Sequence, residues 1–408
     1  MDFAHSARAR ALHTELAEFI DTRVLPAEAI AAAQIAGSGN PHHHPPVLEE
    51  LKAEARERGL WNLFHPHPGA GPGRPGLSNV EYAPLAELMG RSPHLAPEAC
   101  NCNAPDTGNM EILELFGTGE HRRRWLEPLL AGEIRSAFCM TEPGVASSDA
   151  TNIAMAFRRV DGGWRLTGRK WFASNAMHPH LAVLIVMGVT DPDADPHRRQ
   201  SMLVVPADAP GVRVLRNLPV FGYHDREGHA VVEFDGVFVP DADVLAGAGE
   251  GFAIAQARLG PGRIHHAMRC IGMAERALAL LCRRAGERET FGRRLADRDN
   301  IRDWIAESRV DIEMARLLTL KAAWLMDTAG NRAAAQEIAA IKVAAPRAAL
   351  RVVDRAIQVH GGAGVTDETP LASFWAGLRA LRLADGPDEV HLRTIARAEL
   401  RAGRGEVR

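Results

Sequence analysis

A loop of small residues and hydroxyls at 137–152 holds side chains suited to binding a flat, polar ligand. The segment reads AFCMTEPGVASSDATN, so a predicted strand runs into a turn rich in glycine, alanine and serine. Gly144 lets the backbone approach a ligand closely, while Thr141, Ser147 and Ser148 supply short hydrogen-bond donors. These residues predict a cradle for a polar ligand, although surface turns of similar composition are common.

An acidic turn at 383–391 has the sequence LADGPDEVH and could do acid–base chemistry. Burial disfavours the ionised form of a carboxylate and brings its basicity closer to working pH. Asp385 and Gly386 precede Pro387, however, a favoured first helical residue, and acids there usually cap helices or complement the helix dipole. The local sequence favours this capping role for Asp385.

Composition argues against two classes of partner. The chain has 408 residues, with 48 basic and 51 acidic side chains, and its length predicts two or three domains. It has no basic stripe with interleaved aromatic residues, so we expect no nucleic-acid partner. The longest apolar run, 181–189, suits a buried strand and is too short to span a membrane. Residues 1–12 lack the apolar core of a signal peptide.

Cysteines and histidines give no metal-binding pattern. The five cysteines form an odd count without disulfide spacing, which predicts free thiols in a reducing compartment. The lack of a recognisable targeting segment and the Ala/Arg-rich composition predict a cytoplasmic location. Cys100 and Cys102 form a C-x-C pair, but no second ligand pair lies nearby in the sequence. His42, His43 and His44 fall in a proline-rich segment and are interpreted as a flexible surface tract. We therefore expect no metal site.

The hydrophobic pattern is helical, then β-rich, then helical again, and predicts domains at 1–135, 136–245 and 246–408. Gly/Pro-rich loops at 37–46 and 66–77 interrupt the first part. In the second part, short β-rich runs begin at 164, 181, 201 and 230, with turns predicted at 161–163 and 235–236. In the third part, the pairs at 330–331 and 361–362 separate long helices of a predicted four-helix bundle.

Six segments, in matching order and spacing, resemble signatures of the acyl-CoA dehydrogenase family. They read FGTGE with WLEPLLAGE (116–133), AFCMTEPGVASSDATN (137–152), KWFASN (170–175), RETFG (288–292), QVHGGAG (358–364) and DGPDEVH (385–391). The last one most resembles the branch of acyl-CoA dehydrogenase family members 10 and 11. The resemblance implies a mostly α fold with a central β-barrel, placed between an N-terminal helical domain and a C-terminal four-helix bundle.

The same resemblance implies a reaction. Family members are FAD-dependent: a carboxylate takes the α proton of an acyl-CoA thioester, flavin N5 accepts the β hydride, and a 2-enoyl-CoA leaves. An electron-transferring flavoprotein is the expected acceptor of the electrons. Asp385 stands at the base position, where most relatives have glutamate in a Glu-Gly-Thr context. Aspartate is one methylene shorter, so substrate or backbone must lie closer.

The resemblance also assigns binding positions. For FAD they are Phe138, Met140, Thr141, Ser147, Ser148, Phe172, Ser174, Arg288, Thr290, Gln358, Gly361, Gly362, Pro387, Asp388 and Glu389. For acyl-CoA they are Ser148, Arg263 and Gly386. Arg288 and Thr290 match residues that reach the FAD of a neighbouring subunit, which implies a homodimer or homotetramer.

Two other functions remain open from the sequence. Nitroalkane oxidases resemble this family and use an aspartate base, so a flavin-dependent oxidase on the same fold is one alternative. The absence of the usual glutamate leaves a non-catalytic scaffold that binds flavin or CoA as another.

Overall fold

The computed structural model describes residues 4–65 and 76–404 of the chain. The side chains of Leu259, Gly260, Pro261 and Arg263 lie outside this description, as does most of the loop predicted at 66–77. The residues form two compact units. The helical unit comprises 1–26, 55–97 and 263–408, and the sheet unit comprises 27–54 and 98–262. The three domain boundaries inferred above stay a prediction.

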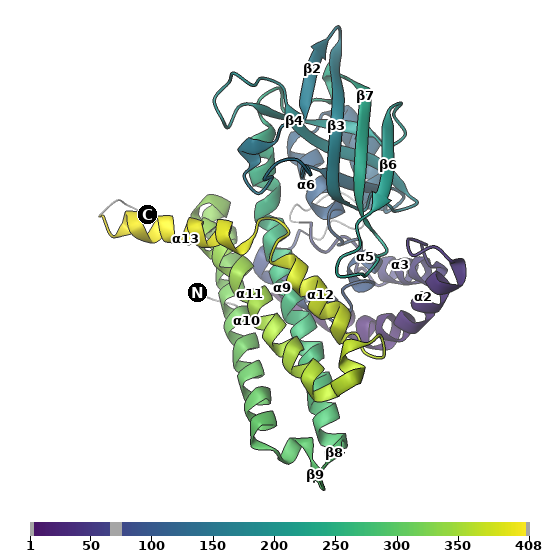
Figure 1. The fold of residues 1–408 in the computed structure, drawn as a ribbon, viewed down its shortest axis with the longest axis vertical. Helices are drawn as coiled ribbons and strands as arrows, with labels where there is room; N and C mark the ends of the chain where they lie inside the picture. Colours follow the sequence, from purple (N-terminus) through teal and green to yellow (C-terminus); the bar gives the residue numbers. More distant parts are fainter. Residues whose placement is uncertain (1–3, 66–75, 405–408) are drawn as a thin grey trace. The chain divides into compact units, whose positions relative to one another are not determined.

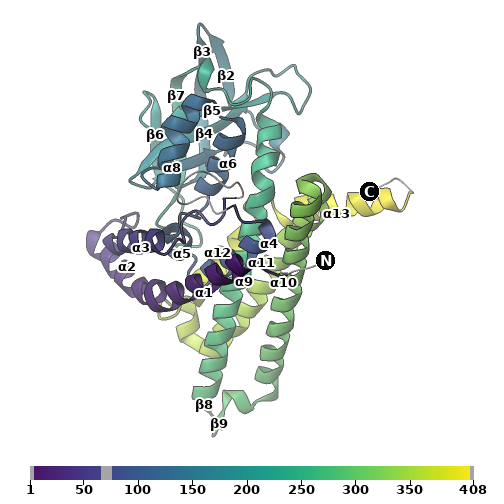
Figure 2. The same cartoon turned by 180° about the vertical axis from the view of Figure 1, so that it is seen from behind.

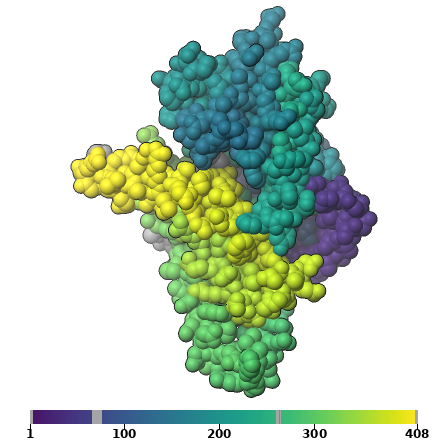
Figure 3. Space-filling model, viewed as in Figure 1, coloured from purple at the N-terminus to yellow at the C-terminus, as the bar shows by residue number. Residues whose placement is uncertain are grey.

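Long helices make up most of the helical unit (Figure 1). They are α1 (Ala7–Phe19), α4 (Asn79–Gly90), α9 (Gly251–Glu287, of which the part from residue 263 belongs here), α10 (Asp299–Ala333), α11 (Ala335–His360), α12 (Leu371–Leu381) and α13 (Asp388–Ala402). A short hairpin, β8 (Glu289–Thr290) with β9 (Arg293–Arg294), joins α9 to α10. The C-terminal helices, yellow in Figure 3, lie on the surface of this unit.

Helices α10, α12 and α13 of the helical unit all pack on α11. Its buried face includes Ile338, Ile341, Ala345, Val352 and Val359, at spacings of three, four and seven residues. Such a stripe buries apolar surface along one side of a helix. The breaks predicted at 330–331 and 361–362 are confirmed, since Gly330 and Gly361 adopt positive φ angles of 81° and 64°.

The sheet unit contains seven strands with helices beside them (Figure 2). The strands are β1 (Arg135–Cys139), β2 (Ala156–Val160), β3 (Gly163–Ser174), β4 (Leu181–Val189), β5 (Gln200–Pro206), β6 (Val212–Asn217) and β7 (His229–Pro240). The helices are α2 (Leu25–Ser38), α3 (Pro46–Glu57), α5 (Ala96–Ala99), α6 (Asp106–Phe116), α7 (Gly119–His121) and α8 (Glu127–Ala131), with α2, α3 and α5 crossing a unit boundary. Helix α6 packs on β1.

The sheet is mixed, with the order β1-β4-β2-β3-β7-β6, and β5 pairs with β4. Strand β1 runs parallel to β4, whereas β3 and β7 form a long antiparallel pair. The predicted fold class of helices around a central β-rich region is confirmed, although the strand pairing does not show a closed barrel. No helix in the described part of the chain is both long and apolar enough to cross a membrane.

One predicted turn is wrong. Asp235 and Gly236 lie inside β7 rather than between two strands. The register shifts between Leu166 and Gly168 on the neighbouring strand β3, opposite this point, and Gly236 has a φ of 64°. Glycine with positive φ is common at β-bulges, which disturb a strand without ending it. The Asp-Gly pair therefore marks a bulge here.

The expectation that the cysteines form no disulfides agrees with the structure: none of the five, all within the described residues, is in a disulfide bond, and Cys100, Cys102, Cys139 and Cys270 are buried. In the buried surroundings of Cys139, desolvation raises the pKa of the thiol to about 12, despite the charge of Lys170. Such a thiol stays protonated and inert near neutral pH.

Two glycines let α4 and α9 approach closely. A Cβ on Gly272 would overlap the carbonyl oxygen of Glu87, and a Cβ on Gly90 would overlap that of Arg269. We predict that Gly272→Ala lowers the free energy of unfolding of the helical unit by about 1–3 kcal/mol, because the helices must separate. Gly286→Ala is the matched control on the same helix, since nothing lies within 4 Å of its added methyl. Urea unfolding followed by circular dichroism measures both. Equal stability of the two variants would contradict the packing described.

Candidate functional site

Two of the predicted ligand-binding segments meet inside the sheet unit. The backbone N–H of Trp171 donates to the carbonyl of Thr141 at 2.9 Å. The ammonium of Lys170, fully buried, donates to the carbonyl of Met140 at 2.9 Å and to the carboxylate of Glu142 at 2.6 Å. Burial lowers the pKa of Lys170 while Glu142 pulls it upward. The loop after β1 is thus fastened to β3.

Glu142 also shapes the loop. Its carboxylate accepts hydrogen bonds from the backbone N–H groups of Ala154 and Met155, each at 2.9 Å. The hydroxyl of Ser147 accepts from the backbone N–H of Glu142 at 2.9 Å, whereas Ser148 is exposed. Ser147 therefore holds the loop in place, and Ser148 is the hydroxyl left at the surface of the sheet unit.

Aromatic rings stand beside this loop. Phe172 has a φ of 51° and is 46% exposed, although phenylalanine rarely adopts left-handed backbone. The ring of Trp171 meets it edge-on, with 5.1 Å between centroids. The guanidinium of Arg258 lies 4.0 Å from the centre of the Phe138 ring. Ser174, at the end of β3, is half-buried. These side chains give the loop an apolar surface beside a polar one.

In the helical unit, the acidic turn presents Asp385 on left-handed backbone. Asp385 has a φ of 53° and Gly386 a φ of 100°. A carboxylate oxygen of Asp385 lies 3.4 Å from Nε2 of His266, on α9, and both side chains are about one-fifth exposed, at 23% and 21%. The buried ammonium of Lys342 donates to the carbonyls of Leu381 and Gly386 and so fixes the backbone of the turn.

Asp388 fixes the other end of the turn. Its Oδ2 accepts from the guanidinium groups of Arg347 at 3.0 Å and Arg382 at 2.7 Å. Burial alone would raise the pKa of Asp388, but these hydrogen bonds hold it below its ordinary value. Helix α13 begins here, with Pro387 at its N-cap and no side-chain cap hydrogen bond from it. Glu389 is exposed.

The remaining predicted residues of the helical unit lie elsewhere. Arg288 and Thr290 belong to the segment that follows α9, at the opposite end of the long helices from α13 (Figures 1 and 2). His266, which faces Asp385, is 22 helical residues away from Arg288, or about 30 Å at 1.5 Å per residue. Gln358, Gly361 and Gly362 lie at the end of α11, all exposed. Arg263 is within α9, and its side chain lies outside the described residues.

A separate cluster of buried ionisable groups surrounds Glu98 in the sheet unit. Lys52 lies 3.1 Å and Arg135 3.3 Å from its carboxylate, and Arg226 forms a third ion pair. All four side chains are buried. Burial alone would raise the pKa of Glu98, but Arg226 and Arg135 hold it well below its usual range.

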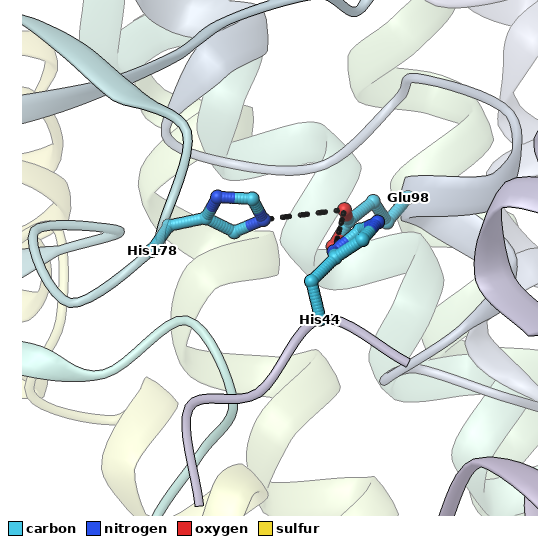
Figure 4. Close-up of side chains that lie close together, drawn as sticks. All are labelled: His44, Glu98 and His178. Atoms are coloured by element: carbon cyan, nitrogen blue, oxygen red, sulfur yellow. Dashed lines mark ion pairs between the residues drawn. The ribbon is translucent and has the colours of Figure 1, made fainter. Parts of the chain in front are cut away.

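Histidines from the predicted surface tract belong to this cluster, so that prediction is wrong. His42 is 6% exposed and bonds to the carbonyl of Arg226. Nδ1 of His44 lies 3.7 Å from Glu98, and Nε2 of His178 lies 3.6 Å from the same oxygen (Figure 4). The composition of the segment is that of an exposed loop. The partner that buries it, Glu98, lies more than fifty residues away in the sequence, so local composition could not reveal the contact.

Two histidines and a carboxylate at these distances could hold a metal ion. The hydrogen bonds argue otherwise. Nδ1 of His178 accepts the backbone N–H of His180 at 3.0 Å, so neutral His178 carries its proton on Nε2, the atom that faces Glu98. Three cations, Lys52, Arg135 and Arg226, already surround the Glu98 carboxylate and would repel a metal ion. We interpret the cluster as a buried ion-pair network, and the absence of a metal stays a prediction.

Family comparisons agree with the sequence motifs. Residues 137–237 match the model of the acyl-CoA dehydrogenase middle domain, and residues 249–400 match that of the acyl-CoA dehydrogenase C-terminal domain. The chain belongs to the acyl-CoA dehydrogenase family. This is a family of flavin-dependent oxidoreductases whose cofactor is FAD.

Individual relatives support the same branch as the last motif. The chain is 54% identical to the probable acyl-CoA dehydrogenase FadE2 of Mycobacterium tuberculosis, covering 98% of this chain and 97% of that one. It is 51% identical to acyl-CoA dehydrogenase family member 11 of Mus musculus over 98% of its own length, and spans about half (51%) of that longer protein. A candidate acyl-CoA dehydrogenase from Mycobacterium abscessus has a solved structure with a TM-score of 0.93, 52% identity and coverage of 97% and 99% of the two chains.

The described residues fit a flavin in two respects. The loop at 140–148 and the end of β3 are fastened together, and they present half-buried hydroxyls beside an exposed Phe172 ring. At the end of α11, a Cβ on Gly361 or Gly362 would meet nothing within 4 Å, so backbone is open to a ligand. Sequence reasoning missed Glu142, Lys170 and His266. Glu142 and Lys170 lay inside quoted motifs, where their opposite charges were the available signal.

We predict that Glu98→Gln destabilises the sheet unit by about 3–5 kcal/mol, because it leaves buried guanidinium and ammonium groups without their counter-charge. Asp241→Asn is the control, since Asp241 pairs with Arg159 at an exposed position and should change stability little. Thermal unfolding of both variants measures the difference. A Glu98→Gln protein as stable as Asp241→Asn would show that the cluster does not hold the unit together.

Acid should weaken the same cluster through His44. Burial and the charge of Lys52 lower the pKa of His44 to about 4. An unfolded chain takes up this proton near pH 6.5, so stability is lost as pH falls from about 6.5 to about 4. We predict that His44→Gln flattens the fall of melting temperature across this window, whereas exposed His197→Gln leaves it unchanged. Parallel slopes for wild type and His44→Gln would refute the assignment.

Proposed function

We propose that this protein catalyses the FAD-dependent α,β-dehydrogenation of an acyl-CoA thioester to a 2-enoyl-CoA. The observation that carries the proposal is the position of Asp385. Its carboxylate stands on a left-handed turn, held by Lys342 on one side and by Asp388 with its two arginines on the other. A partly exposed carboxylate on a fixed turn is suited to take a proton from a bound substrate.

Asp385 acts as the base that removes the α proton. A helix-capping role has less support, because the N-cap of α13 is Pro387 and the Asp385 carboxylate faces His266. His266 can donate a hydrogen bond to the carboxylate and so fix its orientation. Aspartate is shorter than the glutamate of most relatives, and left-handed backbone at Asp385 is one way to bring its carboxylate to the substrate.

FAD, when bound, supplies the acceptor for the β hydride. Phe138, Met140, Thr141, Ser148, Phe172 and Ser174 would line its ring, and Ser147 would support them by holding the loop. Gly386 and Ser148, with Arg263, are the proposed contacts to acyl-CoA. Pro387, Asp388 and Glu389 are the remaining proposed contacts to FAD.

The proposed assembly is a homodimer or homotetramer. Arg288 and Thr290 lie about 30 Å along α9 from the Asp385 turn, so they would bind the FAD of a second subunit. The ring of Phe291 between them and β9 is 98% exposed, and Val310, Met314 and Leu317 form an exposed stripe on α10. Rings and stripes of this kind favour contact with another chain.

An electron-transferring flavoprotein is the proposed acceptor, and the cytoplasm is the proposed location. Five cysteines without a disulfide bond agree with a reducing compartment.

We predict that acyl-CoA bleaches the flavin of the wild-type protein under anaerobic conditions, and that Asp385→Asn slows this bleaching by about 10²–10⁴-fold. Asparagine keeps the size of the side chain but does not accept the proton. Rapid-mixing absorbance at the flavin band measures the rate over a panel of acyl-CoAs. Asp367→Asn, at an exposed position before α12, is the control and should bleach like wild type.

Other outcomes would decide between the alternatives. Equal bleaching of Asp385→Asn and wild type would show that Asp385 is not the base. Bleaching by a nitroalkane but by no acyl-CoA, with reoxidation by oxygen, would favour the oxidase. A wild-type protein that binds FAD and is bleached by neither would favour the scaffold.

A further inference from the structure

Two side-chain hydrogen bonds connect Ser174 with an acidic residue in the sheet unit. The hydroxyl of Ser174 lies 2.8 Å from Nδ1 of His229, and Nε2 of His229 lies 2.9 Å from the carboxylate of Asp225. His229 and Asp225 are 26% and 28% exposed. The dehydrogenase function proposed above uses Ser174 at the flavin edge but gives no role to the two residues behind it.

The backbone builds this chain of contacts. Ser174 and His229 stand directly opposite each other in the antiparallel pairing of β3 with β7, so their side chains share one face of the sheet. The backbone N–H of His229 donates to the side chain of Asn217 at 2.7 Å. A turn closed by the Gly228 N–H to the Asp225 carbonyl, at 2.9 Å, returns Asp225 to the ring of His229.

When Asp225 is ionised and His229 is neutral, both hydrogen bonds have one direction. An ionised carboxylate only accepts, so Nε2 of His229 must carry a proton and donate it to Asp225. In the neutral imidazole, Nδ1 then has no proton and accepts from the hydroxyl of Ser174. Because its hydroxyl proton is donated to His229, Ser174 can only accept a hydrogen bond from any further partner. Asp225 and His229 thus make the serine an acceptor.

A nucleophilic role for Ser174 does not fit its position. In hydrolases with a Ser-His-Asp triad of the nucleophile-elbow type, the serine stands on a sharp turn between a strand and a helix. Ser174 is instead a strand residue, paired with β7.

We propose that Asp225 and His229 act as positioning residues that tune the balance between oxidised and reduced FAD through the hydroxyl of Ser174. The proposal rests on the dehydrogenase function above, in which Ser174 lies at the polar edge of the flavin. The flavin nitrogen that receives the hydride is an acceptor before reduction and carries an N–H after it. A serine hydroxyl that can only accept a hydrogen bond can pair with the N–H of the reduced flavin. It cannot donate a hydrogen bond to the same nitrogen in the oxidised flavin. The chain from Asp225 to Ser174 therefore favours reduced FAD.

The experiment is a measurement of the flavin midpoint potential by anaerobic chemical reduction against a reference dye, at pH 8. The variants are Asp225→Asn, His229→Phe and Ser174→Ala, with each of the first two also combined with Ser174→Ala. Asparagine can donate to Nε2 and so reverse the tautomer of His229, while the contacts stay in place. Phenylalanine keeps a ring and removes both nitrogens.

We expect Asp225→Asn and His229→Phe each to shift the ratio of oxidised to reduced affinity by about tenfold toward oxidised FAD, the effect of one hydrogen bond. Tenfold corresponds to a potential lower by about 30 mV for a two-electron couple. In the Ser174→Ala background, neither substitution should shift the potential further. Asp241→Asn, an exposed acid at the end of β7, should leave it unchanged.

Three results would overturn the proposal. The potential could stay the same in both single variants, with FAD bound and the flavin spectrum of wild type, which would make the pair purely structural. The shifts could persist without the Ser174 hydroxyl, which would show that they do not act through it. A wild-type chain that takes up no FAD would overturn this proposal together with the proposed function. A flavin that no acyl-CoA bleaches would instead count against the dehydrogenase function alone, because chemical reduction needs no substrate.

Discussion

The buried carboxylate of Glu98 is the constraint on which the sheet unit depends. Removing a carboxylate from water is costly unless cations accompany it, and here Lys52, Arg135 and Arg226 supply them. These residues come from α3, from the first position of β1 and from the loop before β7. Burying any one of the four charges without its partners would be unfavourable, so the distant segments that carry them must pack together in the folded unit.

The consequence for the site follows along β1. Arg135 fixes the start of the strand, and the loop at 140–148 leaves from its end. A second buried ion pair, between Lys170 and Glu142, then fastens that loop to β3. One ion pair, Arg135 with Glu98, therefore fixes the start of β1, and another, Lys170 with Glu142, fixes the loop just after its end. These two ion pairs determine where the hydroxyls of the loop lie. The small residues of the motif leave space for a ligand, whereas the ion pairs determine the position of the loop.

Sequence patterns predicted the order of helical and β-rich regions because periodicity is local, and the breaks at Gly330 and Gly361 because glycine with positive φ ends helices. Sequence patterns gave wrong predictions where a residue distant in the sequence determines the structure.

The segment holding His42 and His44 has the composition of a surface loop, yet its contacts with the cluster around Glu98 bury it. The Asp235-Gly236 pair has the composition of a turn, yet cross-strand pairing with β3 keeps it within a strand. The binding residues came from resemblance rather than periodicity, and the supporting groups Glu142, Lys170 and His266 escaped because a motif does not reveal which charges meet in space.

Phe172 and Phe291 share an unusual property: both are bulky residues on left-handed backbone, with φ angles of 51° and 50°. Left-handed backbone costs an ordinary L-residue about 1–2 kcal/mol that glycine does not incur. The Phe291 ring is 98% exposed, so little packing offsets that cost, whereas Phe172 is 46% exposed and meets the ring of Trp171 edge-on. Selection for heat resistance alone would therefore favour glycine in place of Phe291, and a thermostable descendant chosen without a screen for cofactor binding would lose this ring.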